Sequence, residues 1–467
     1  MRAASTSTST SISIAGAILA ACAALTATSP ARANEADAYG LGSRAAALGG
    51  AVAADATDFS GNYYNPAALV GAKGVSLSVG YIHVENNLRI NDRDNGVAPA
   101  HGIVGGIVAP GRLFGVPFAF GIGTYLPDAG LSRIKALRQE TPRWALYDER
   151  ASIVFLAANL AVRPLPWLDL GGGIAFLAAT KGRFAISGTA DVLHPYDSQL
   201  RHEVDADLTS IRYPQVGARI KIGELGYLGF VYRGETKLKL SIDANLSGLV
   251  DFAGVEIPLL YNLASRTIDA FLPQQVVLGA SFQKVPHLRV NFDLTFVNWA
   301  AYESPTALTT AHLALDLPPG TTLIQLPADP KPTVVIAPAF ENRVVPRVGV
   351  EYTVPAAGAL RRVHGEEHRL FEVPIRAGYV FERSPVPPQA GVTNFVDADR
   401  HTLSLGAGLI VNAPFAELPG QIQLDVHGQL SLLPERITHK DNPADFVGDY
   451  RASGTMVGLG STLSAVF

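Results

Sequence analysis

Segments that alternate apolar with polar or small residues fill most of this chain, and they restrict the possible fold more than any other feature. Around position 290, for example, apolar and polar residues alternate without interruption. The apolar set there is Val290, Phe292, Leu294 and Phe296, and the polar set is Arg289, Asn291, Asp293 and Thr295. Successive side chains of a strand point to opposite faces, so each such segment is a strand with one apolar face.

The connections between these segments alternate in length. The fourteen segments begin near Gly74, His101, Val116, Ala145, Trp167, Leu208, Gly226, Phe271, Leu288, Arg347, Leu370, Arg400, Gln421 and Arg451. After even-numbered segments the connections are mostly short, although Val354–His368 is longer. After odd-numbered segments we expect long loops, among them Thr189–Asp207, Asn245–Ile268 and Ala301–Pro346. This asymmetry predicts an all-β fold, a fourteen-stranded antiparallel transmembrane β-barrel whose chain ends both face the periplasm.

Composition supports this interpretation and excludes others. Hydrophobic residues make up 48% of the 467 residues. Yet no apolar run after the first 33 residues approaches the roughly 20 residues that a spanning helix needs. The net charge of −4 gives no reason to expect a nucleic-acid partner.

The N-terminus is typical of a secretory signal peptide. Arg2 precedes the apolar stretch Ile12–Leu25, and Ala31–Ala33 is a small-residue cleavage site that would leave residues 34–467 as the mature protein. An alternative remains, because the residues before Cys22 also fit a lipoprotein signal that would place a lipid on this cysteine. Cys22 is the one cysteine of the chain, so no intrachain disulfide is possible.

The stretch from Asn34 to Gly74 lacks the alternating pattern and is rich in glycine and alanine. We expect two short helices, Ser43–Ala54 and Pro66–Val70. Asn65 suits the N-cap of the second, and Pro66 suits its first turn. The stretch is too small for a core of its own, so it packs against something larger, unless it is an ordinary N-terminal extension.

Three motifs, in this order, resemble those of the FadL family of outer-membrane transporters for fatty acids and hydrocarbons. The first is the triplet Asn65, Pro66 and Ala67, which matches the family's N-terminal hatch. The second is Asn291–Tyr302, which matches a strand that ends in an Asp/Asn-Trp pair. The third joins Ser384–Pro387 to the family's structural motif, which falls on Asp397, Asp399, Arg400 and His401.

The resemblance implies a hatch at residues 34–73 inside a barrel formed by residues 74–467. It implies passive transport of hydrophobic small molecules, such as long-chain fatty acids or aromatic hydrocarbons, across the outer membrane. The substrate would bind in an apolar lumen pocket and leave sideways through an inward kink of the third strand, Val116–Leu126. Gly121 and Gly123 would supply that kink, since glycine weakens and bends strands.

The last residue, Phe467, lies on the apolar face of the final alternating segment. It resembles the C-terminal signal that the barrel-assembly machinery reads in bacterial outer-membrane barrels. The other partners that we expect are the hydrophobic substrate, outer-membrane lipid and lipopolysaccharide, and we expect a monomer.

Several cations alternate with apolar residues and should therefore face the lumen. Arg219, Lys221 and Arg289 are candidates for binding a substrate carboxylate. The alternative is ion pairing within the wall, with Asp243 or Asp293 as partners. The tryptophans Trp144, Trp167 and Trp299 are expected in the interfacial aromatic girdles.

No motif predicts catalysis, and we expect no enzyme activity, metal or cofactor. The run His364–His368 fits a zinc-protease pattern, but it falls in a charged turn and not on a helix. Two other functions remain open, an aqueous porin and a surface β-protein used for adhesion. A porin needs a wide lumen without a plug, and an adhesin would bury its apolar strand faces against a second sheet.

Overall fold

The structure is a computed structural model, and it describes residues 38–128, 141–144, 146–147, 154–191, 199–252, 255–303, 308–315, 336–363, 366–414 and 420–467. The predicted signal peptide, with Cys22, lies outside the described residues.

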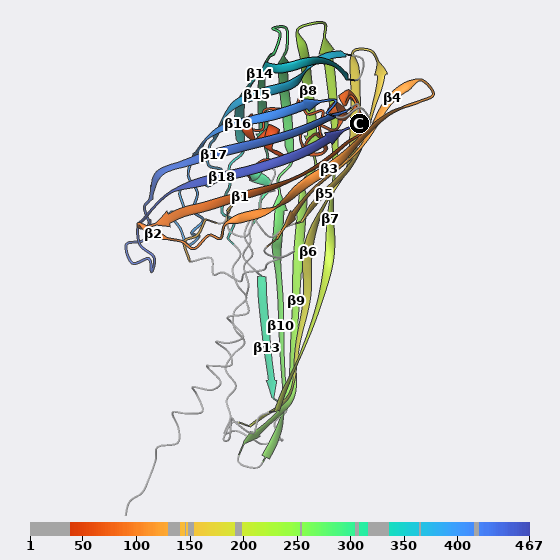
Figure 1. Cartoon of the computed structure of the whole chain (residues 1–467). Helices are drawn as coiled ribbons and strands as arrows, with labels where there is room; N and C mark the ends of the chain where they lie inside the picture. The colour runs from red at the N-terminus through yellow and green to blue at the C-terminus, as the bar shows by residue number, and fades with distance from the viewer. Residues whose placement is uncertain are drawn as a thin grey trace, which may run out of the picture.

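Fourteen of the 18 strands among the described residues form one closed antiparallel wall, as the sequence predicts (Figure 1). Each of the fourteen pairs with the next, and the first, β1, pairs with the last, β18, in an uninterrupted register from Ser76–Val466 to Ile90–Ala452. The wall consists of β1 (Ser76–Ile90), β3 (Ala100–Leu113), β4 (Val116–Pro127), β5 (Phe155–Leu165), β6 (Leu168–Asp191), β7 (Gln199–Ile222), β8 (Gly226–Arg233), β11 (Gln275–Phe282), β12 (Leu288–Val297), β14 (Arg343–Val363), β15 (Glu366–Glu382), β16 (Arg400–Asn412), β17 (Gln421–Thr438) and β18 (Tyr450–Val466).

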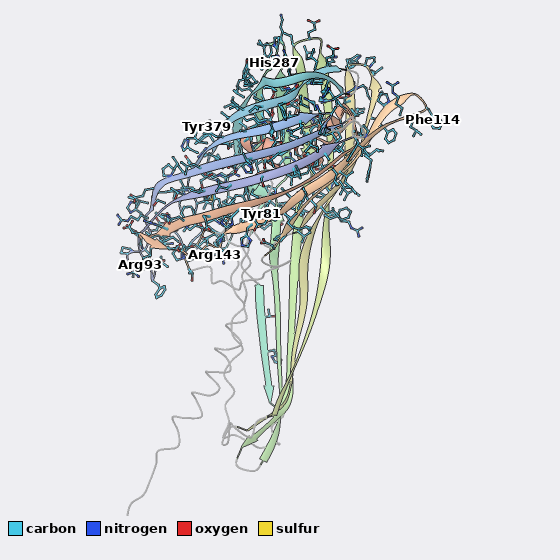
Figure 2. The ribbon with its side chains drawn as sticks, in the orientation of Figure 1. Tyr81, Arg93, Phe114, Arg143, His287 and Tyr379 are labelled. Carbon is cyan, nitrogen blue, oxygen red and sulfur yellow. The ribbon has the colours of Figure 1, made fainter. Side chains whose placement is uncertain are left out.

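The apolar faces of the strands point outward. Leu405 is 68% exposed and Phe292 is 55% exposed, whereas Asp293, on the other face, is buried. A soluble sandwich would bury the apolar faces, so this arrangement excludes the adhesin interpretation and fits a wall surrounded by lipid. Figure 2 shows His287 and Phe114 at the end of the barrel with the short turns, and Arg93 and Arg143 toward the opposite end.

Some predicted boundaries are wrong. The fourth wall strand begins at Phe155 and not near Ala145. The described part of the longer connection predicted at Val354–His368 continues β14 and β15, which pair as far as Val363 and Glu366. Charged residues in this hairpin suggested a loop. Paired strands that extend beyond the lipid are exposed to water, however, so their charged side chains need no desolvation.

The described parts of two predicted loops, Thr189–Asp207 and Asn245–Ile268, are also strands. β6 and β7 continue past the barrel, and β9 (Thr236–Phe252), β10 (Val255–Leu272) and β13 (Leu308–Leu315) extend the sheet beside them (Figure 1). β9 pairs with β6 in parallel and with β10 in antiparallel orientation. Alternation of apolar and polar residues shows that a strand has two different faces. It does not show whether lipid or water surrounds the strand, so it does not mark where the lipid-facing wall ends.

The N-terminal residues 38–73, which we call the plug segment, lie inside the barrel. They contain α3 (Ser43–Ala47), α4 (Gly61–Tyr64) and the 3-10 helix η1 (Pro66–Gly71), and these pack against β3–β7 on one side and β15–β18 on the other. The first helix is shorter than predicted because Gly49 and Gly50 have φ of 64° and 73°, which a helix does not allow. In the described parts of the chain, no helix has the length and apolar character needed to cross a membrane.

Candidate functional site

The Asn-Pro-Ala motif begins a helix that lies against the inner wall. The Oδ1 atom of Asn65 accepts a hydrogen bond of 3.0 Å from the backbone N–H of Ala67, and Pro66 takes the first helical position. The predicted N-cap is therefore confirmed. The Nδ2 atom of Asn65 donates to the carbonyl of Ala53 at 2.6 Å and to that of Ala218 in β7 at 3.2 Å. One side chain thus caps η1, closes the plug segment on itself and ties it to the wall.

Two glycines leave room for this motif. Gly171 in β6 and Gly217 in β7 lie opposite each other in register. A Cβ atom at Gly217 would lie 2.0 Å from Oδ1 of Asn65, and one at Gly171 would lie 2.5 Å from the backbone of Pro66. The motif therefore rests on bare backbone, and any side chain at either position would displace it. Sequence reasoning missed this pair, although the run Gly171–Gly173 was a visible signal.

Gly121 and Gly123, the proposed gate residues of β4, also face the plug segment. A Cβ atom at Gly121 would lie 2.5 Å from Oδ1 of Asn62, and one at Gly123 would lie 2.9 Å from Cβ of Asn62. β4 pairs with β3 and with β5 without any register shift. β4 is therefore paired with both neighbours in this structure, the lateral gate at Gly121 and Gly123 stays a prediction, and these glycines allow the close approach of α4.

Buried amides hold α4 on this side of the barrel. Nδ2 of Asn159 in β5 donates to the carbonyl and to Oδ1 of Asn62 at 3.1 and 3.0 Å, and Nε2 of Gln215 in β7 donates to the same carbonyl at 2.5 Å. Arg233 of β8 donates to the carbonyls of Tyr63 and Tyr64 and lies 4.2 Å from the centre of the Tyr63 ring. No sequence motif marked these residues, because isolated polar residues on a lumen face look alike.

Ion pairs hold the plug segment on the opposite side. Nε of Arg44 in α3 donates to Oε2 of Glu351 in β14 at 3.0 Å, and Nε of Arg376 in β15 donates to the same oxygen at 2.5 Å. Arg376 also donates to Oδ1 of Asp425 in β17 at 2.6 Å. Arg289 completes the set, with Nη1 3.3 Å from Glu351. A buried charge network of this kind requires every member to be paired.

Asp55 belongs to the same network from within the plug segment. It is bonded to Arg44, and Nη1 of Arg289 lies 3.7 Å from its Oδ2. Burial by itself would raise the pKa of Asp55, but the nearby guanidinium groups of Arg44 and Arg289 outweigh burial and lower that pKa below its ordinary value. Asp55 is therefore ionised at neutral pH and holds the two arginines in place.

A polar cavity of about 400 Å³ adjoins this side of the plug segment and extends to Arg219 of β7 and to Gly71 of η1. It lies at the end of the barrel with the short turns, where β1 begins and β18 ends. Its lining includes Arg44, Asp55, Arg219, Arg289, Glu351, Arg376 and Asp425. Its charges are balanced and largely paired, so it is suited to water more than to a hydrophobic molecule.

The three candidate carboxylate-binding cations do not form one site. Arg219 donates from Nε and Nη2 to Asp169 at 2.8 and 2.6 Å. Arg289 pairs with Glu351 and Asp55, and Lys221 is exposed at the rim. Wall carboxylates therefore already occupy both arginines. Asp293 was predicted as an ion-pair partner of these cations, and that prediction is wrong, because Asp293 accepts a hydrogen bond of 2.9 Å from the backbone N–H of Ala53. The other predicted partner, Asp243, has its side chain outside the described residues.

An apolar niche lies on the far side of the plug segment, next to β4. Tyr39 and Leu41 of the plug segment face Ile82 and Val84 of β1, and the lining is completed by Gly40, Ala100 and Tyr125. All seven residues are uncharged, and their free volume is close to 0 Å³. The niche is thus a closed contact between the plug segment and the wall, and a ligand can occupy it only if one of the two moves.

Two of the three tryptophans are not in an interfacial girdle. Trp144 and Trp299 are buried in the connections that follow β4 and β12, and Trp167, beside the turn between β5 and β6, is half exposed. Trp299 belongs to an aromatic cluster with Phe271, Tyr302, Phe340 and Phe395, whose neighbouring ring centres are 5.0–6.0 Å apart. The girdle prediction failed because a tryptophan near a strand end can turn inward under a loop as easily as outward.

The two halves of the third motif meet in space. The hydroxyl of Ser384 donates to Asp397 at 2.8 Å, and Asp399 accepts from the backbone N–H of Ser384 at 2.8 Å. Arg400 is bonded to Glu382 and donates to the carbonyl of Ala38 at 3.3 Å. His401 lies on the outer side against the hydroxyl of Tyr379, at 2.8 Å. The motif thus closes one loop and fastens the start of the plug segment.

The chain end lies at the seam of the barrel. The backbone N–H of Phe467 donates to the carbonyl of Val75 at 2.8 Å, and its ring is 54% exposed on the lipid-facing side. The zinc-like run is partly described, and Glu366–His368 belong to β15, where His368 pairs with Glu372. Within the described residues no three metal-binding side chains come together.

Comparison with known proteins gives a consistent result. The sequence profile of the family described as outer membrane protein transport protein (OMPP1/FadL/TodX) matches residues 19–362. No curated protein matches the sequence significantly.

Among solved structures, the chain is similar in fold to the following three. A Pseudomonas aeruginosa FadL homologue is 15% identical with a TM-score of 0.54, over 91% of this chain and 97% of that one. The CymD monoaromatic hydrocarbon channel is 17% identical with a TM-score of 0.53, over 91% and 97%. The P. putida toluene transporter TodX is 15% identical with a TM-score of 0.51, over 92% and 99%. With the closed fourteen-stranded wall, these matches show that the chain is an outer-membrane barrel and belongs to the OMPP1/FadL/TodX family of transport proteins.

Proposed function

We propose that this protein conducts hydrophobic small molecules passively through the outer membrane. The observation that carries the proposal is the apolar niche between the plug segment and β1, β3 and β4. In this niche an uncharged lining lies between the plug segment and the wall, next to the third wall strand.

The niche would hold substrate once the plug segment shifts. Its lining has no charged group, so it favours an uncharged hydrocarbon over a carboxylate, whose burial without a partner is costly. Arg219 and Arg289 do not change this preference, since both already bind carboxylates of the protein. Aromatic hydrocarbons are therefore the favoured substrates, with long-chain fatty acids second.

The exit that we propose is sideways, past β4, as the family resemblance implies. Because β4 is fully paired in this structure, transport requires the wall beside Gly121 and Gly123 to open. Asn62 rests against these glycines, so movement of α4 would free β4 to bend inward. Asn65, Pro66 and Ala67 would couple that movement to η1.

Uptake measured per folded barrel tests the proposal. Val84→Phe overfills the niche and should lower uptake of a labelled aromatic hydrocarbon about tenfold, because overpacking costs roughly 1–3 kcal/mol. Val79→Phe makes the same change on the lipid-facing side of the same strand and should have no effect. Equal uptake by both variants would contradict the role of the niche.

A second candidate, the aqueous porin, has less support because the plug segment fills the lumen. A conductance measurement in planar bilayers separates the two functions. A large steady ion current through the wild-type protein would favour the porin.

A further inference from the structure

A depression of about 480 Å³ lies on the outer wall where β17, β18 and β1 run side by side toward β2 (Arg93–Asp94) (Figure 1). It is separate from the lumen and from the niche. Leu432 and Pro434 border it on one side and Asn87 and Arg89 on the other, with Ser453, Gly454 and Thr455 as its floor.

A β-bulge creates the depression. Leu433 pairs with Gly454 and Arg436 with Ala452, so two residues of β17 face the single residue Ser453. The bulge turns Arg436 toward the inside, where it donates to the carbonyl of Val386 at 2.7 Å. Of the two bulged residues, Pro434 borders the depression and Glu435 is exposed beside it, and the small residues of β18 form a shallow floor.

Arg89 is the cation of the depression. Its side chain is exposed, and its Nε donates to Oδ1 of Asn87 at 3.1 Å. Its two terminal amino groups have no partner among the described residues. Nearby Arg451 is instead paired with Asp92. A guanidinium fork with unused donors, beside the hydroxyls of Ser453 and Thr455, suits a phosphate group.

The depression lies at the extracellular rim of the lipid-facing belt. Leu430 and Val457, which follow it toward the periplasm, are 40% and 47% exposed on the outward face. Beyond it the outward positions become polar, with Ser453 and then Arg451. A bound amphiphile would therefore place its head group at Arg89 and its chains along Leu432 and Leu430.

We propose that this depression binds a phosphorylated, acylated glycolipid of the outer leaflet. Its phosphate contacts Arg89 and the hydroxyls of Ser453 and Thr455, and its acyl chains follow the apolar face of β17. The inference rests on the outer-membrane location and not on the transport substrate.

Binding of purified lipid A to the detergent-solubilised full barrel, measured by native mass spectrometry, tests the site. Arg89→Ala should weaken binding of the phosphorylated lipid about fivefold, which is the effect of one cation near an anionic surface. Arg89→Lys should retain part of it. Arg112→Ala is the matched control, because Arg112 is an exposed arginine at the opposite end of the barrel and should leave binding unchanged.

A second variant keeps the charge and removes the space. Ser453→Leu fills the floor and should lower lipid binding while Arg89 remains. Dephosphorylated lipid A should bind all variants equally weakly. Equal effects of Arg89→Ala and Arg112→Ala, or unchanged binding by Ser453→Leu in a barrel with normal heat-modifiable mobility, would overturn the proposal. Uptake of hydrocarbon by Arg89→Ala should remain normal, so failure of this proposal and failure of the transport proposal are distinguishable.

Discussion

The plug segment is held by two different surfaces on opposite sides of the barrel. Toward β4–β7 it rests on glycines and neutral amides, and Asn62, Asn65 and Gln215 are fully buried there. Toward β14–β17 it is held by the ion pairs of Arg44, and the cavity of about 400 Å³ lies alongside. We call these the amide side and the charged side.

The contrast shows how the plug segment can fit closely against the wall on one side and still be able to move. Around Asn62 and Asn65 the amide side is close-packed, so its strength there depends on shape and is lost when any atom is added. The charged side adjoins a cavity, so water can replace a broken ion pair at moderate cost. We infer that displacement of the plug segment begins on the charged side, with the amide side as the hinge.

The largest expected effect is on the amide side. Gly171→Val places side-chain atoms where a Cβ atom alone would lie 2.5 Å from the backbone of Pro66 and Ala67, so η1 cannot seat. Proteolysis of the plug segment should become at least about tenfold faster, in line with roughly 1–3 kcal/mol for overpacking. Gly172→Val is the control, since its Cβ atom would face outward with the nearest atoms at 3.3 Å. Equal protection in both variants would show that the glycine seat does not hold the plug.

A smaller effect is expected on the charged side. Glu351→Ala leaves Arg44 and Arg376 without their shared acceptor, and loss of one partner of a buried pair costs about 3–5 kcal/mol when no water can reach it. The adjoining cavity should reduce this cost, so the plug should loosen less than in Gly171→Val. Urea titration of plug protection measures the difference. Glu372→Ala is the control, because this carboxylate borders the same cavity but pairs with His368 of the wall. A larger effect for Glu351→Ala than for Gly171→Val would reverse the proposed order of the two sides.

The smallest effect is a dependence on pH. The pKa of Asp55 is lowered in the folded state, so its ion pairs stabilise the seated plug above the ordinary pKa of about 4. That stabilisation is lost as the pH falls through the lowered pKa. Digestion with an acid-active protease should therefore release the plug segment increasingly below about pH 4.

Asp55→Asn should loosen the plug already at mildly acidic pH and flatten this dependence. Asp58→Asn should keep it, because Asp58 accepts from Ser60 within the plug segment and not from the network. A pH profile for Asp55→Asn that matches the wild type would assign the acid effect to other carboxylates.

Much of the fold was predictable because a barrel in lipid imposes its pattern directly on the sequence. All fourteen wall strands were found from alternation, since each must present an apolar face to lipid and a polar face to the lumen. The extension formed by β9, β10 and β13 was not found. These three strands lie beside the closed wall. Alternation shows that a segment is a strand, but it does not show which other strand pairs with it.

The candidate site was predictable only where a local rule applied. Asn65 and Pro66 were assigned as cap and first turn because both roles depend on adjacent residues. Gly171 and Gly217, which lie 46 positions apart and receive that motif, depend on the register of β6 with β7. The partners of Arg219 and Arg289 depend likewise on which strands close the barrel.

The sequence by itself therefore determined the class of fold, the number of wall strands, the cap of η1 and the family. These follow from periodicity and from short motifs, which act over a few residues. Only the tertiary structure decided that Asn62 packs against Gly121 and Gly123, that Arg44 pairs with Glu351, and that β4 is hydrogen-bonded to both neighbouring strands. Each of these contacts depends on where the plug segment lies within the closed wall. The contacts join residues that are distant in the chain, so they are fixed only when the barrel closes around the plug segment.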